Sequence, residues 1–267
     1  MTSRPSAALA FSLAVAAGLV ACRRAPSPAS ERAPVRVAAA ADLSSAFGEL
    51  GRAFERDTGQ PVVFSFGSTG LLAKQLREGA PFDLFAAASA SFVDDVVAAG
   101  ACDGSTKVAY ARGRIALWSK RGGVAPPASL ADVAAPRFKR VAIANPEHAP
   151  YGQAAREALV RAGVWAAVEP RLVLGENVRQ ALQLAETGNV EVAVVALSLV
   201  ATDAVNPSLV VDEALHGPID QALAVCNRGK RRDGGEAFGR YVTSEPGRAV
   251  MRRYGFLLPG ETPARAP

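Results

Sequence analysis

Four junctions in the sequence place polar groups at the expected start of a helix, directly after a strand or loop. They are Ala41 with Asp42, Ser68 with Thr69, Pro150 with Tyr151, and Asn177 with Val178. The first amides of a helix have no intrahelical acceptor and carry a partial positive charge. Several such starts directed at one point could hold an oxyanion without any Lys or Arg. Every α/β protein has such junctions, so the prediction depends on their convergence, which spacing alone does not show.

The hydroxyls of Ser68 and Thr69 would add donors to such a site, whereas Asp42 would oppose it. A carboxylate about 4 Å from a dianion is repelled by roughly several kcal/mol, even at an effective dielectric near 20. We therefore expect the Asp42 side chain to serve as a helix N-cap that accepts from the amides of Ser44 and Ser45. Its own backbone N–H would then be free to face the anion.

Catalytic and metal-binding patterns are weak by comparison. Ser68 lies in the stretch "FGSTG", which lacks the glycine two residues before the serine that a nucleophile elbow needs, and no base is assignable to it. The two histidines, His148 and His216, are isolated and do not form a zinc pattern. In the loop "PEHAP", we interpret the two prolines as rigidifying the segment that presents the Tyr151 amide. The sequence predicts no catalytic residue, no cofactor and no bare metal ion.

Composition sets the broad class. The chain has 267 residues, 49% of them hydrophobic, and a formal net charge of +5, enough apolar content for a substantial core. Basic residues are dense only at 228–232, which we interpret as a solvated loop. No aromatic stacking platform accompanies them, so nucleic-acid binding is not predicted.

The N-terminus predicts export. Arg4 precedes an apolar run over residues 7–21, which has the length of a secretory leader and is short for a membrane span. The run ends in "LVAC", which resembles a bacterial lipobox with Cys22 as the lipid-modified residue. We expect residues 1–21 to be a signal peptide and residues 22–34 a lipidated tether. An oxidising compartment would permit a bridge between Cys102 and Cys226, but does not establish one.

Strand-like and helix-like segments alternate from Val35 onward, which predicts an α/β fold with mostly parallel sheets and covering helices. Strands are expected at residues 35–41, 61–66, 82–88, 114–119, 140–144, 170–174, 190–196 and 219–226. Helices are expected at residues 43–57, 71–78, 91–99, 151–162, 176–187 and 235–251.

Several stretches carry a family resemblance that spans nearly all of residues 35–256. They include "VAAAADL", "FSFGSTGLLAKQ", "GAPFDLFAAAS", "NPEHAPYGQAAREAL" and "GENVRQALQL". Together they resemble the periplasmic molybdate-binding proteins of ABC transporters. The resemblance implies a two-lobed type II periplasmic-binding-protein fold with the ligand in the interlobe cleft. Lobe 1 would comprise residues 35–113 with 219–258, lobe 2 residues 114–218, and residues 259–267 a tail.

The resemblance also implies the ligand positions. They fall on Asp42, Ser68, Thr69, Tyr151 and Val178, with Ala41 beside them, as ligands of the oxyanion and not of a bare cation. Tyr151 and Val178 would act through their backbone N–H. Two departures stand out. Many members have Ser at the position of Asp42, and some place a Tyr hydroxyl where this chain has Ala196; Tyr151 is the candidate to replace that hydroxyl.

The implied function is capture of molybdate, with tungstate as a second ligand, and delivery to an ABC permease. The protein would be extracytoplasmic, monomeric, and attached to the membrane only through its N-terminal lipid. It would not be an enzyme. The alternative is a binding protein for another tetrahedral oxyanion such as sulfate, and a remote alternative is a hydrolase with a Ser nucleophile.

Overall fold

The computed structural model describes residues 1–2 and 33–262. Cys22 and nearly all of the predicted signal peptide and tether lie outside the described residues, so their assignment stays a prediction. Within the described part of the chain, no helix has the length and apolarity needed to cross a membrane.

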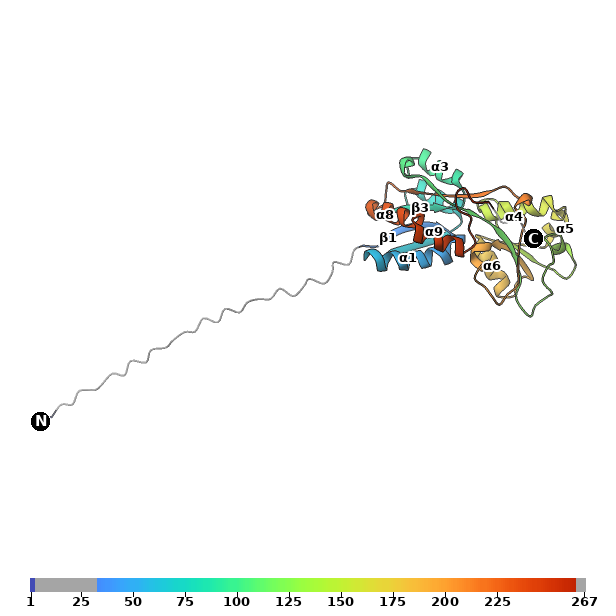
Figure 1. The fold of residues 1–267 in the computed structure, drawn as a ribbon, viewed down its shortest axis with the longest axis horizontal. Helices are drawn as coiled ribbons and strands as arrows, with labels where there is room; N and C mark the ends of the chain where they lie inside the picture. The colour runs from blue at the N-terminus through green and yellow to red at the C-terminus, as the bar shows by residue number, and fades with distance from the viewer. Residues whose placement is uncertain (3–32, 263–267) are drawn as a thin grey trace. The chain divides into compact units, whose positions relative to one another are not determined.

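The first of two five-stranded sheets has the order β2-β1-β3-β10-β4 (Figure 1). Its strands are β1 (Val35–Ala40), β2 (Val62–Gly67), β3 (Leu84–Ala87), β4 (Val108–Gly113) and β10 (Ile219–Val225). Strands β2, β1 and β3 run parallel, and β10 is antiparallel to both of its neighbours. The last strand of the chain therefore returns to the first sheet.

The second sheet repeats this plan with the order β7-β6-β8-β5-β9. Its strands are β5 (Ile115–Trp118), β6 (Val141–Ala144), β7 (Leu172–Gly175), β8 (Val192–Ala196) and β9 (Ser208–Val210). Strands β7, β6 and β8 are parallel, and β5 is antiparallel to β8 and β9. All eight predicted strands overlap an observed one. The six-residue strand β4 and the three-residue strand β9 were missed.

The chain crosses between the sheets twice, from β4 to β5 and from β9 to β10. For the two lobes we propose the division predicted from the sequence, residues 35–113 with 219–258 for lobe 1 and residues 114–218 for lobe 2. It fits the strand ends, because β4 ends at Gly113 and β10 begins at Ile219.

Helices cover both sheets. They are α1 (Ser44–Thr58), α2 (Thr69–Arg77), α3 (Ala90–Ala98), α4 (Pro150–Arg161), α5 (Trp165–Val168), α6 (Val178–Glu186), α7 (Leu197–Val200), α8 (Arg232–Thr243) and α9 (Glu245–Arg253), with a 3-10 turn η1 at Ala41–Leu43. Further 3-10 turns lie at Gly104–Thr106, Ala131–Ala134, Glu169–Arg171 and Glu213–Leu215. The helix α1 buries Phe47, Leu50 and Phe54, and the Phe47 ring meets Phe238 of α8 edge-on at 5.6 Å.

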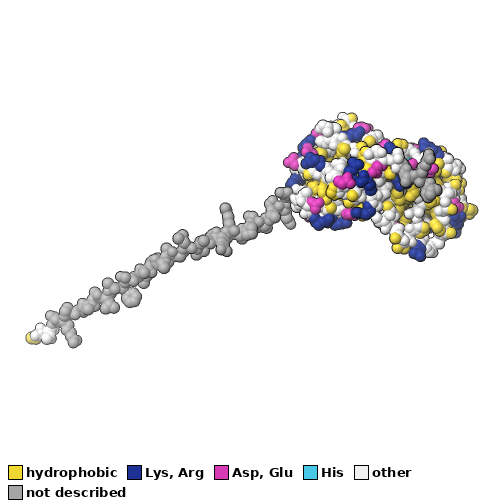
Figure 2. Space-filling model, in the orientation of Figure 1, with side chains coloured by type: hydrophobic (Ala, Val, Ile, Leu, Met, Phe, Trp, Pro, Cys, Tyr) yellow, Lys and Arg dark blue, Asp and Glu magenta, His cyan; other side chains and the backbone are white. Residues whose placement is uncertain are grey.

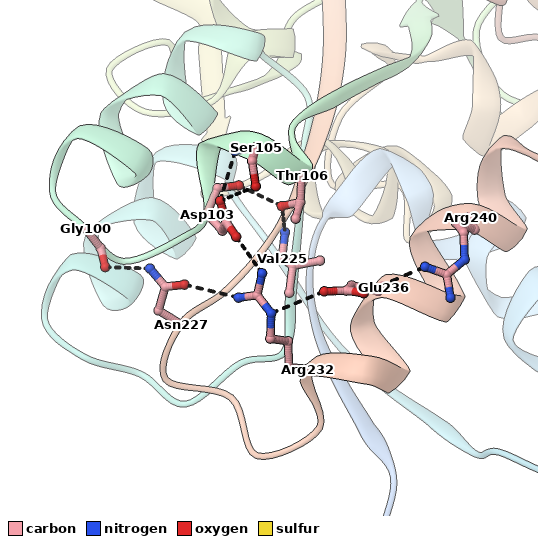
Figure 3. Close-up of polar contacts among 9 residues, drawn as sticks. All are labelled: Gly100, Asp103, Ser105, Thr106, Val225, Asn227, Arg232, Glu236 and Arg240. Atoms are coloured by element: carbon pink, nitrogen blue, oxygen red, sulfur yellow. Dashed lines mark hydrogen bonds and ion pairs between the residues drawn. The ribbon is translucent and has the colours of Figure 1, made fainter.

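The predicted single helix over residues 235–251 is wrong in one respect, because the structure has two helices there. They meet at Ser244, whose extended backbone ends α8, and whose side chain accepts from the Gly247 amide to cap α9. Arg232 at the start of α8 pairs with Asp103 and Glu236, fixing α8 to the turn before β4 (Figure 3). Cys102 and Cys226, whose pairing the sequence left open, form a disulfide.

Charged side chains of both signs are interspersed over the visible face (Figure 2). This dispersal matches the scattered basic residues of the sequence.

Candidate functional site

One small cavity is lined by residues of both lobes. The lining residues are Ala40, Ala41, Asp42, Gly67, Ser68, Thr69, Ala88, Ala149, Pro150, Tyr151, Asn177 and Val178. All six residues predicted from the sequence are among them. The cavity volume is about 10 Å³, close to that of a single water-sized sphere, so the cavity is small.

Three helices begin at this cavity. Thr69 is the first residue of α2, Tyr151 the second of α4 and Val178 the first of α6. Within residues 33–262, none of their three backbone N–H groups has a protein acceptor. Three positive helix ends therefore offer free donors to one point. Among the described residues that line the cavity, none is Lys or Arg, so the site suits an anion held by neutral donors.

The two hydroxyls at the start of α2 differ in what they bind. Thr69 Oγ1 accepts a hydrogen bond from the Ala88 N–H at 3.1 Å, which leaves its own proton available to a ligand. Ser68 Oγ instead donates to the His148 carbonyl oxygen at 2.7 Å. Thr69 is thus the better candidate for a hydroxyl donor in the cavity.

The Asp42 carboxylate does not cap a helix, contrary to the expectation from the sequence. Its Oδ2 accepts hydrogen bonds from Gln221 Nε2 at 2.7 Å and from the Tyr151 hydroxyl at 3.0 Å. Asp42 lies within the η1 turn, two residues before α1 begins, and Leu43 holds the position before the helix without a side-chain cap. The Asp42 side chain therefore accepts from Gln221 and Tyr151, which are remote in sequence. The expected donors were the local amides of Ser44 and Ser45.

Burial dominates the titration of this carboxyl. Asp42 is 1% exposed and its Oδ1 has no partner in the described part of the chain. Desolvation raises the pKa of Asp42 to about 6, although the hydrogen bonds from Gln221 and Tyr151 act to lower it. The carboxyl is therefore far easier to protonate than an exposed aspartate, which reduces its repulsion of an anion.

The Tyr151 hydroxyl, the candidate to replace the tyrosine hydroxyl absent at Ala196, is already engaged within the protein. It donates to Asp42, and burial and the nearby Asp42 carboxylate hold its own pKa well above the ordinary value. Ala196 is fully buried at the end of β8. The Tyr151 backbone N–H has no protein acceptor within residues 33–262, and it stays the group that we expect Tyr151 to offer the cavity.

Sequence reasoning missed the residues that support Asp42. Gln221 is fully buried in β10, beside a break in the strand register, and its Oε1 accepts from the Tyr110 hydroxyl at 2.7 Å. Ser198 Oγ donates to the Asp42 carbonyl oxygen at 2.8 Å. The one available signal was a glutamine inside the apolar strand "IDQALAV", since a buried amide needs polar partners.

The part of the chain that the structure describes forms no cation site at the cavity. Within residues 33–262, no group of three or more His, Cys, Asp or Glu side chains is placed to share a metal ion. His148 instead contacts Ser68, with Nδ1 2.8 Å from Ser68 Oγ.

Residues 35–257 match the family model of the bacterial extracellular solute-binding proteins. The chain belongs to this family. Its members bind solutes and are not enzymes, so the hydrolase alternative is set aside. The short distance between Ser68 and the His148 ring does not support a hydrolase. The Ser68 proton is donated to the His148 carbonyl oxygen and not to the imidazole ring.

Two relatives of this solute-binding protein are molybdate-binding proteins named ModA. The one from Azotobacter vinelandii is 34% identical, over 92% of this chain and 96% of the relative. The one from Rhodobacter capsulatus is also 34% identical, over 84% of this chain and 88% of the relative. The solved structure of the Azotobacter vinelandii periplasmic molybdate-binding protein is similar, with a TM-score of 0.78 and 26% identity over 84% of this chain and 99% of that one. The predicted two-lobed α/β fold is confirmed.

Proposed function

We propose that this protein captures molybdate outside the cytoplasm and delivers it to an ABC permease. The observation that carries the proposal is the convergence of three helix-start amides without protein acceptors on one small cavity. The 34% identical relatives named as molybdate-binding proteins support the choice of anion.

The chemistry needs only hydrogen bonds and dipoles. Molybdate is a tetrahedral dianion whose four oxygens accept hydrogen bonds. The N–H groups of Thr69, Tyr151 and Val178 and the Thr69 hydroxyl would donate to them, with the backbone of Ala41, Asp42 and Ser68 alongside. No covalent step is required, because transport needs only different affinities in the open and closed forms.

The finer assignments belong to the same proposal. Tungstate has the same charge and shape as molybdate, so we expect it to bind as a second ligand. Sulfate has the same charge on a smaller tetrahedron and is the competing candidate. We also propose that the mature protein is a monomer, located outside the cytoplasm and held at the membrane by a lipid on Cys22.

Calorimetric titration of the mature chain with molybdate, tungstate, sulfate and phosphate tests the ligand. We expect molybdate and tungstate to bind at least about a hundredfold more tightly than the other two, a difference of roughly 3 kcal/mol. Tighter binding of sulfate would move the assignment to the sulfate alternative. Absence of binding for all four anions would overturn the proposal.

A further inference from the structure

Three polar contacts join His148 of lobe 2 to the start of α2 in lobe 1. The His148 carbonyl oxygen accepts from Ser68 Oγ at 2.7 Å and from the Gly70 N–H at 3.0 Å. His148 Nδ1 lies 2.8 Å from Ser68 Oγ. Since the Ser68 proton is already donated to the carbonyl oxygen, the ring Nδ1–H is the donor in the third contact.

Only glycine at position 70 permits this approach. A Cβ at Gly70 would lie 2.7 Å from the His148 carbonyl oxygen and 3.1 Å from the His148 Cβ. The nearer obstacle is a backbone atom, which no rotamer change can move aside. Any side chain at position 70 would therefore push the His148 loop away from α2.

A second polar link between the lobes, from the Tyr151 hydroxyl to Asp42, lies beside a crossover of the chain. A Cβ on Gly113, the last residue of β4, would be only 2.1 Å from the Tyr151 hydroxyl that binds Asp42. That buried link is therefore next to a connection that stays intact however far the lobes separate. The His148 contacts involve no crossover residue. His148 is half-buried and its neighbour Glu147 is exposed, so these contacts lie nearer the protein surface than the fully buried Tyr151–Asp42 bond.

The same contacts fix the distance between two of the helix starts. Ser68 directly precedes Thr69, and His148 stands three residues before Tyr151. When His148 holds Ser68 and Gly70, the free amides of α2 and α4 are held on one cavity. When these contacts break, the amides at the start of α2 and those at the start of α4 are free to separate.

We propose that Ser68, Gly70 and His148 form an interlobe latch that engages as the lobes close on the anion and slows its release. This inference rests on the proposed function. His148 is a positioning residue here, because it holds Ser68 and Gly70 and does not line the cavity. The Ser68 hydroxyl serves the latch, and the Thr69 hydroxyl is left for the ligand.

Dissociation kinetics test the latch. Mature wild-type protein and variants are loaded with radiolabelled molybdate, and its release is followed after addition of excess unlabelled molybdate. We expect His148→Ala to release molybdate roughly two- to tenfold faster, as for the loss of one net hydrogen bond, with an association rate within about twofold of wild type. His148→Asn keeps the backbone acceptor and restores a side-chain donor, so it should recover part of the difference. Glu147→Ala is the matched control and should release at the wild-type rate.

Gly70→Ala separates the latch from a merely structural role. Alanine favours a helix over glycine, so the melting temperature of the ligand-free variant should stay level or rise. Molybdate release should nevertheless be at least about tenfold faster, because the lobes cannot approach.

The outcomes distinguish the two proposals. Wild-type release rates in both Gly70→Ala and His148→Ala, in a protein that binds molybdate, would overturn the latch alone. A wild-type protein that binds no molybdate would overturn the proposed function, and the latch's role in retaining molybdate with it.

Discussion

The Tyr151 hydroxyl of α4 donates to Asp42 Oδ2 at 3.0 Å, linking lobe 2 to the turn that follows β1 in lobe 1. Both side chains are almost fully buried. Tyr151, whose amide we propose as a donor to the anion, thus also donates a hydrogen bond to the carboxylate that lines the same cavity.

Tyr151→Phe tests this link. The hydroxyl is lost and Asp42 keeps only Gln221 as a side-chain donor, so we expect the free energy of unfolding to fall by about 1–3 kcal/mol. Molybdate affinity should change less than about threefold, because the backbone N–H remains. Urea denaturation and calorimetry measure the two quantities. Tyr241→Phe removes a similar bond to the exposed Asp57 and should cost well under 1 kcal/mol.

Asp42→Asn removes the charge and keeps an oxygen that can accept from Tyr151 and Gln221. We expect this variant to bind molybdate as tightly as wild type or more tightly near neutral pH, because a repulsive charge is gone. Asp42→Ala leaves the Tyr151 hydroxyl proton without its acceptor, and leaves Gln221 Nε2 with only its 3.1 Å contact to the Tyr151 oxygen. It should destabilise the fold by about 1–3 kcal/mol for that reason and not through a lost cap. If Asp42→Asn abolished binding, the carboxylate itself would be required and molybdate would be the wrong ligand.

The pH dependence of stability follows from the same residue. The pKa of Asp42 is about 6 in the folded protein against an ordinary 3.8, so between these values the folded state holds a proton that the unfolded chain has released. The stabilisation of the folded state that comes from the raised pKa of Asp42 is complete below pH 3.8, and it is lost as the pH rises through 6. Relative to Asp42→Asn, the wild-type free energy of unfolding should fall by at most about 3 kcal/mol between pH 4 and 7. Urea titrations at several pH values measure it, and parallel curves for the two proteins would contradict the prediction.

The sequence predicted the helix starts well because they depend on local chemistry. Asn177 shows this: its side chain caps α6 by accepting from the amides of Arg179 and Gln180. The strands were also predicted from a local signal, because buried parallel strands have continuous apolar sequences. The exposed three-residue strand β9 gave no such signal.

The partners of Asp42 and His148 could not be predicted in the same way. Gln221 lies 179 positions from Asp42, and Ser68 lies 80 positions from His148. Only the return of β10 to the first sheet and the closure of the two lobes bring these pairs together. From the sequence alone, the amides of the following helix are the nearest donors for the Asp42 side chain, so an N-cap was predicted. Its observed donors, Gln221 and Tyr151, are brought to it only by the fold.

Cys22→Ser tests the membrane anchor, which lies outside the described residues. If Cys22 carries the lipid, wild-type protein should fractionate with membranes, and the variant should be released or remain unprocessed. Fractionation and mass spectrometry of the mature N-terminus measure this. Wild-type protein found wholly in the soluble fraction with an unmodified N-terminus would contradict the prediction.

Thr69→Ala tests the hydroxyl assigned to the ligand. Thr69 Oγ1 accepts the Ala88 amide and keeps a free proton, and removing a donor to a buried charged ligand costs roughly 1.5–3 kcal/mol. Calorimetry should therefore show molybdate affinity falling by about one to two decades, while Thr69→Ser retains most of it. Thr106→Ala is the matched control, because Thr106 Oγ1 likewise accepts a backbone amide, that of Val225, but donates its proton to the Asp103 carbonyl oxygen (Figure 3). Both alanine variants should melt at a lower temperature, since each leaves an amide without its acceptor, but only Thr69→Ala should lose affinity. Equal affinities in the two would assign Thr69 a purely structural role and leave the anion to the backbone amides.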